Sequence, residues 1–137
     1  MTRRSDRGSA AVEAAVIAPA FIALMLLVVY AGRVVNGGNE VESAASAAAR
    51  AASQMATPSA AAAEAQQVAV ASLADSGVTC DPSRVEVDTQ LLAPGGSVTV
   101  TVRCTTQLGD ITLIELPGHQ TFEASATEVV DVYRGGG

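Results

Sequence analysis

The longest uninterrupted apolar stretch of the chain lies close to its N-terminus. No charged residue occurs in the nineteen residues from Ala14 to Gly32, which read AAVIAPAFIALMLLVVYAG. As a helix this run would rise about 28 Å, which is close to the hydrocarbon thickness of a bilayer. Pro19 is compatible with such a helix, because membrane helices tolerate helix-breaking residues. The pattern predicts a single transmembrane helix, for which we take the range 9–35.

The charges on either side of this run predict its orientation. Residues 1–8 carry three Arg and one Asp, whereas the first charged residues after Arg33 are the acidic Glu40 and Glu42. An excess of basic residues marks the cytoplasmic side of a membrane helix, so the rest of the chain would lie outside the cytoplasm. A cleaved secretory signal is the competing interpretation. Its apolar region usually has about 7–15 residues, so the longer run here favours a retained helix.

Two alanine-rich segments follow with helical spacing. Asn36-Gly37-Gly38-Asn39 predicts a break or a flexible joint, since each glycine weakens a helix by about 1 kcal/mol. Small and apolar residues then recur on one helical face between residues 40 and 56. Thr57-Pro58 suits the cap and first residue of a second helix, which would run to about Ala74 and stop at Gly77. We therefore expect an Ala-rich helical stalk over residues 36–77.

The C-terminal half alternates between apolar and polar residues with a period of two, which is typical of strands. Two such runs lie at 85–91 and 97–104, and a third lies near 121–133. Pairing Leu91 with Val98 would place Val85 opposite Cys104 on one apolar face. The expected fold class is α+β: a long N-terminal helix with one membrane segment, a further Ala-rich helix and a small antiparallel sheet of about three strands. The sheet would form an extracytoplasmic domain at 78–134, before a disordered tail at 135–137.

The chain has two cysteines, Cys80 and Cys104. The extracytoplasmic side permits disulfides, and the expected register brings Cys104 to the end of the sheet where Cys80 enters. A bridge would close a loop of about 25 residues and stabilise the domain by about 3 kcal/mol. Two reduced, buried thiols are the alternative.

Composition excludes several functions. The net charge is −6 with eight Arg and no Lys, whereas nucleic-acid binding needs a basic face. One His and two Cys cannot form a four-ligand zinc site without carboxylates. The sequence offers no nucleophile paired with a base, because His119 follows Pro117-Gly118 in an expected surface turn. We therefore predict no catalytic residue, no metal and no cofactor, and we do not expect an enzyme.

The start of the apolar run contains one acidic residue, Glu13. An acid there opposes insertion, although less near a helix end than at its centre. Either Glu13 reaches the headgroup zone, or it awaits a positive partner inside the membrane. Ala10, Ala14 and Ala18 recur every four residues beside it, a spacing that lets membrane helices approach closely. General enrichment in alanine is the other explanation of that row.

These N-terminal residues together suggest a family. A basic leader ends in Gly8, then come Ser9-Ala10-Ala11-Val12-Glu13 and the apolar helix. This arrangement resembles the class III signal of type IV pilin-like proteins. The stretch from Arg7 to Ala20 most resembles the TadE-like pseudopilins of tight-adherence pilus systems. The resemblance covers residues 7–56 with fair specificity and the remainder loosely.

The resemblance implies a processing site and an assembly residue. A prepilin peptidase would remove a cytoplasmic leader, residues 1–8, by cutting after Gly8, which makes Ser9 the first mature residue. Glu13 then occupies the fifth mature position, where this class carries its acid. Major pilins carry a methylated Phe at the position of Ser9, so methylation is not carried over.

The expected function is that of a minor pseudopilin or assembly factor of a tight-adherence pilus. Its partners would be the prepilin peptidase, other pilin-like subunits, the pilus assembly platform and the membrane. It would lie in the cell membrane with a single span, or in a surface pilus. The alternative is a membrane-tethered binding or sensor module, which needs neither Gly8 nor Glu13.

Overall fold

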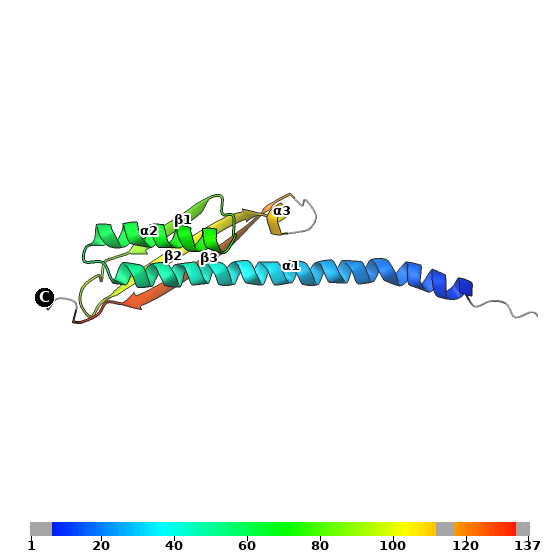
Figure 1. Ribbon diagram of the computed structural model, residues 1–137, viewed down its shortest axis with the longest axis horizontal. Coiled ribbons are helices and arrows are strands. Elements are labelled where there is room, and N and C mark those ends of the chain that lie inside the picture. The colour runs from blue at the N-terminus through cyan, green and yellow to red at the C-terminus, as the bar shows by residue number, and fades with distance from the viewer. Residues whose placement is uncertain (1–6, 112–116, 134–137) are drawn as a thin grey trace, which may run out of the picture.

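The computed structural model describes residues 7–111 and 117–133. The order of elements is α1 (Arg7–Ser53), α2 (Pro58–Asp75), β1 (Ser83–Asp88), β2 (Ser97–Gln107), α3 (Leu108–Ile111) and β3 (His119–Val129). Half of α1 projects from a small body that contains all the other elements (Figure 1). This is the α+β arrangement predicted from the sequence, with one long N-terminal helix, a second helix and a three-stranded antiparallel sheet. The tail at 135–137 and the leader up to residue 6 lie outside the described residues.

The expected joint at Asn36-Gly37-Gly38-Asn39 is wrong, because α1 is an unbroken helix of 47 residues. The reason lies in β3, whose Phe122 packs its ring against this part of the helix. A Cβ on Gly37 would lie only 3.0 Å from the Phe122 Cζ, so a side chain at this position would crowd the ring. Phe122 is 9% exposed. The aromatic contact thus explains Gly37 inside the helix, and burial of the ring offsets the weak helix propensity of glycine.

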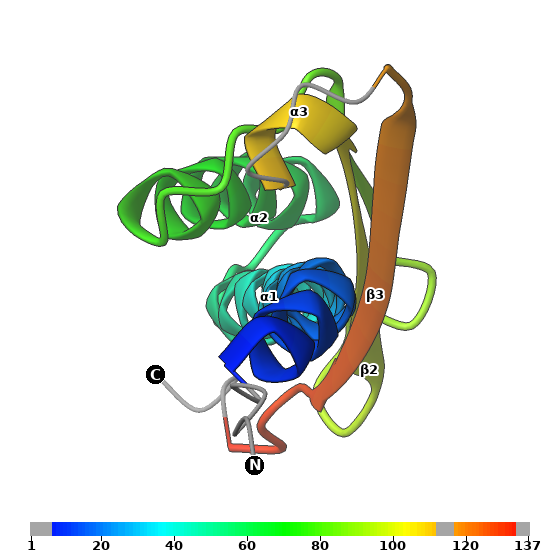
Figure 2. The same cartoon turned by 90° about the vertical axis from the view of Figure 1, so that its right-hand side faces the viewer.

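The second half of α1 is the centre of the hydrophobic core. Both helices lie on one face of the sheet, with α1 against β2 and β3 and α2 against β1 (Figure 2). Small side chains line the faces by which the two helices meet, and such residues let backbones approach closely. The fully buried residues of the two helices are Val41, Ala44, Ala45, Ala48, Ala49 and Ala52 of α1 and Ala61, Ala65 and Ala69 of α2.

The ends of α2 form as the sequence predicts. Thr57 caps the helix by accepting a hydrogen bond on its Oγ1 from the Ala60 amide at 3.3 Å, and Pro58 begins the first turn. At the other end Gly77 has a φ of +74°, which glycine adopts without strain. The Val78 amide donates to the Leu73 carbonyl and the Gly77 amide to the Ala74 carbonyl, which closes the helix with a Schellman motif.

The sheet has the order β1-β2-β3, and its strands are antiparallel. Its inner face consists mainly of Val98, Val100, Val102 and Cys104 of β2. The predicted register is wrong by two residues, since Ser83 lies opposite Cys104 and Val85 opposite Val102. The chain leaves β1 at Asp88 and turns, and the Ser97 amide bonds to the Leu91 carbonyl, so Leu91 belongs to the turn. A shift of two leaves every side chain on its predicted face.

The third strand ends earlier than the alternating pattern predicts. β3 stops at Val129, whereas the pattern runs to residue 133. Phe122, Val130 and Val132 have the same parity in this pattern. Phe122 and Val130 are buried, but Val132 is 61% exposed and lies beyond the strand. A period-two pattern shows which residues share a face, and it does not show where the partner strand ends.

Candidate functional site

The projecting half of α1 is an apolar surface with no protein packed against it in the described residues. Its hydropathy averages 2.5 over a window of 18 residues, none of which is buried. Most of the large side chains on it are 42–70% exposed: Val12, Val16, Ile17, Phe21, Ile22, Leu24, Met25, Leu27, Val28 and Val29. An exposed apolar surface of this length is costly in water and suits a bilayer. The arrangement indicates single-pass anchoring in a membrane.

The residues predicted for processing and assembly lie at the free end of this helix. The structure begins α1 at Arg7, so Gly8 and Ser9 belong to its first turn. Glu13 is exposed on the same helix. Ser9 and Glu13 are four residues apart, which corresponds to a rise of about 6 Å along the helix axis.

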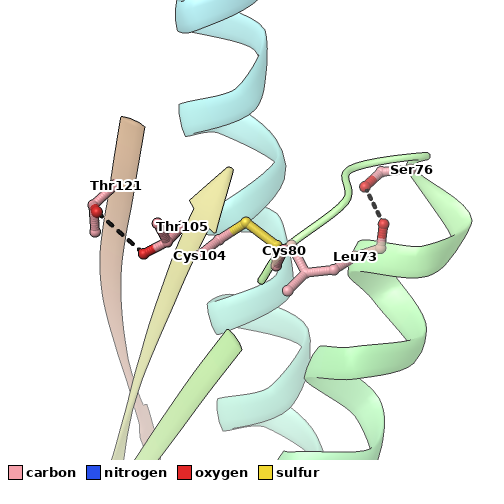
Figure 3. Close-up of a disulfide and its surroundings, with 6 residues drawn as sticks. All are labelled: Leu73, Ser76, Cys80, Cys104, Thr105 and Thr121. Carbon is pink, nitrogen blue, oxygen red and sulfur yellow. Dashed lines mark hydrogen bonds between the residues drawn. A yellow bond between two sulfur atoms is a disulfide. The ribbon is translucent and has the colours of Figure 1, made fainter. Parts of the chain in front are cut away.

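Cys80 and Cys104 form a disulfide in the structure, with their Cα atoms 5.0 Å apart (Figure 3). Cys104 is fully buried on the inner face of β2, and Cys80 lies in the segment between α2 and β1. Beside the bridge, the Asp81 amide donates to the Thr105 carbonyl and the Thr105 amide to the Pro82 carbonyl. The covalent bond and these two hydrogen bonds fix the α2–β1 connection to the central strand.

The outer face of the sheet is polar and lies away from the helices. Hydroxyl groups pair across β2 and β3, with Thr99 and Thr127 at 2.8 Å and Thr105 and Thr121 at 3.1 Å. Arg103 lies between them and forms ion pairs with Glu123 and Glu86. The hydrogen bond that Arg103 Nε donates to Glu123, and then the charges of both carboxylates, raise the pKa of Arg103 above its ordinary value. These side chains are about half exposed, so the pairs order a solvated surface and add little stability.

The described residues hold no cluster of three or more His, Cys, Asp or Glu side chains that could bind a metal. His119 is exposed at the start of β3. Asp88 uses its Oδ1 to accept a hydrogen bond from the Gln90 amide, which is an ordinary turn contact. The Asp88 carboxylate and the His119 imidazole are therefore arranged like ordinary solvated surface groups.

Sequence reasoning missed one feature, a cleft of about 660 Å³ where the projecting half of α1 enters the body. Its walls come from α1, the segment after α2, the end of β2, α3 and β3. The polar residues Arg33, Asn36, Thr106 and Asp110 line it, beside apolar Val29 and Phe122. No sequence pattern indicates the cleft, because five segments far apart in the chain contribute to it.

The fold combines an exposed apolar helix, which suggests single-pass membrane anchoring, with a small disulfide-linked α+β domain. Residues 8–50 match the family model of TadE-like proteins, which confirms the predicted resemblance over that segment. The match begins at Gly8, includes Glu13, and ends within the last turn of α1. It points to a protein associated with tight-adherence pili. Comparisons with curated proteins and with solved structures gave no match.

The position of the disulfide leads to a prediction about the stability of the body. Replacing Cys80, as Cys80→Ala, removes the bridge and leaves the buried Cys104 sulfur in the core. We expect the free energy of unfolding to fall by about 3 kcal/mol, because the open chain regains the entropy of a closed loop. Urea denaturation of the purified full chain measures the change. Alkylation followed by mass spectrometry should find no free thiol in the exported wild-type protein, and two alkylated cysteines would contradict the bridge.

Proposed function

We propose that the protein is a minor pseudopilin or assembly factor of a tight-adherence pilus, and that a prepilin peptidase cleaves it after Gly8. The observation that carries this proposal is the family match, which starts at Gly8 and covers the exposed apolar helix together with Glu13. Residues 1–8 are then a cytoplasmic leader. The body formed by the second half of α1, α2 and the sheet lies outside the cytoplasm.

Cleavage changes the charge at the cytoplasmic end of the helix. The leader holds Arg3, Arg4 and Arg7 and one Asp, so its removal takes away basic residues that keep the helix end on the cytoplasmic side. It leaves a new α-amino group on Ser9, one helical turn before Glu13. Because the structure has Gly8 in the first turn of α1, the peptidase must unwind that turn to reach extended backbone. Glycine favours such unwinding, since it is the weakest helix former after proline.

The new amine gives Glu13 a role in assembly. A carboxylate at the membrane face is costly on its own, and so is an unpaired ammonium group. When two subunits pack side by side, the amine of one and Glu13 of the other neutralise each other. Removing either partner would leave an uncompensated charge in a medium of low dielectric constant. The exposed row of Ala10, Ala14 and Ala18 allows the close helix approach that this pairing needs.

The packing of α1 supports a structural role. One continuous helix runs from the apolar segment into the core of the body, so a load on the helix reaches α2 and the sheet directly. The partners of such a subunit are other pilin-like subunits and the pilus assembly platform. A subunit that acts by packing against others in this way needs no catalytic side chains.

A tethered binding module is the second candidate, and the cleft beside Arg33 favours it. The two functions differ in their need for the leader. A binding module would keep its activity in a Gly8→Lys variant, because its ligand contacts the body alone. A pseudopilin with the same change would keep its leader and fail to assemble.

The processing proposal predicts the N-terminus of the mature protein. Chain purified from membranes of cells that hold the peptidase should begin at Ser9, and the Gly8→Lys variant should begin at Met1 or Thr2. N-terminal sequencing or intact-mass measurement identifies the start. An intact leader on the wild-type protein would contradict the proposal. A start near Ala45, as a conventional secretory signal would give, would also contradict it.

The pairing proposal predicts a separate effect of Glu13. Glu13→Ala should leave membrane insertion and cleavage intact, because removing an acid favours the bilayer and the peptidase site is unchanged. Association with other pilus subunits should be weaker by a few kcal/mol, since the amine loses its partner. Co-purification of tagged subunits and a count of surface fibres measure the loss.

Two further variants separate charge from other effects of that substitution. Glu13→Gln keeps the side-chain volume and should assemble as poorly as Glu13→Ala. Glu42→Gln removes the same charge from an exposed position in the extracytoplasmic half of α1 and should assemble normally. Normal fibres from both Glu13 variants would show that this carboxylate merely reaches the headgroups.

A further inference from the structure

The cleft at the base of the body lies at a defined height along α1. Val29 and Gly32 line its lower part and belong to the uncharged run, whereas Arg33, which also lines it, is the first charged residue after that run. If α1 spans a bilayer through this run, the boundary between Gly32 and Arg33 lies near the headgroups. The cleft would therefore lie at the surface of the membrane, with Val29 on the side of the acyl chains.

A buried hydroxyl group points to a polar occupant. The inward positions of β2 carry Val98, Val100, Val102 and Cys104, and the row ends with Thr106 at the cleft. Thr106 is 5% exposed. Among the described residues it is the only polar residue that is buried. A valine would suit this inward position as well as it suits the three before it. The Thr106 hydroxyl gives the wall of the cleft a polar group that a valine would lack.

The charges that line the cleft have both signs. Arg33 on α1 supplies a guanidinium group, which suits a phosphate because it offers several donors in a fixed plane. The Asn36 amide and the Thr106 hydroxyl add neutral donors. Asp110 on α3 supplies a carboxylate, which repels a phosphate and attracts an ammonium group. A ligand that carries both groups matches this lining better than an anion alone.

We propose that the cleft binds the headgroup of an aminophospholipid of the bilayer in which α1 is anchored. The phosphate would contact Arg33, Asn36 and Thr106, the ammonium group would contact Asp110, and the start of the acyl chains would lie against Val29. This inference rests on the membrane anchoring of α1 in the proposed function, and it is independent of cleavage and of pilus assembly. Its consequence is a body held at a fixed height and orientation on the membrane surface.

Native mass spectrometry of the full chain tests this directly. The protein is placed in nanodiscs with equal amounts of phosphatidylethanolamine, phosphatidylglycerol and phosphatidylcholine. The protein is then released from the nanodiscs in the mass spectrometer, and the lipids that stay bound to it are counted. We expect one retained phosphatidylethanolamine per chain. Arg33→Gln should lower that retention about tenfold, since a charge-assisted hydrogen bond to phosphate is lost. Asp110→Asn should abolish the preference for phosphatidylethanolamine over phosphatidylglycerol.

Two more variants control for damage to the fold. Thr106→Val matches the other inward residues of β2, so the disulfide should form normally while lipid retention falls. Arg50→Gln removes the same charge as Arg33→Gln from an exposed position farther along α1, and should retain lipid as the wild type does. Equal retention by the wild type, Arg33→Gln and Thr106→Val would overturn the proposal.

The remaining outcomes separate the sources of the ligand and the two proposals. Added glycerophosphoethanolamine or inorganic phosphate should not displace the lipid at millimolar concentration, and displacement would assign the cleft to a free solute instead. Wild-type protein that stays in the bilayer on alkaline washing but retains no lipid contradicts this inference alone. Protein that alkaline washing removes contradicts the membrane anchoring, and with it the proposed function.

Discussion

The structure depends on the burial of one half of a single helix whose other half is apolar and exposed. From Val41 to Ala52, α1 packs between α2 and the sheet through residues no larger than valine. Small side chains allow the close packing by which a domain with few aromatic residues can still form a core. The same helix continues without a break into the exposed apolar segment, so the body and the membrane anchor share one rigid axis.

Local signals in the sequence were sufficient for most of the elements but not for their ends or for how they meet. The apolar run, the Thr57-Pro58 cap and the Gly77 stop each act within a few residues, and each was correctly predicted. The joint at Gly37-Gly38 was wrong because its meaning depends on Phe122, which lies more than eighty positions later in the chain. The β1–β2 register was wrong for a similar reason, since the turn that contains Leu91 sets it and alternation does not.

The candidate sites also differ in whether local sequence could predict them. Gly8 and Glu13 lie within six residues of each other, and the resemblance they carry is confirmed by the family match over residues 8–50. Their roles in cleavage and assembly remain proposals that the variants above test. The cleft could not be predicted, because Arg33, Thr106 and Asp110 meet only after the helices have folded onto the sheet.

Hydrogen exchange along α1 in a lipid bilayer tests the continuity of the helix most directly. The amides of residues 36–39 lie beyond the uncharged run and are accessible to water if they are not held in the helix. If Phe122 and the rest of the sheet hold this segment helical, its amides should exchange as slowly as those from Val41 to Ala52. Fast exchange confined to residues 36–39, between two slowly exchanging helices, would show a flexible joint and contradict the account.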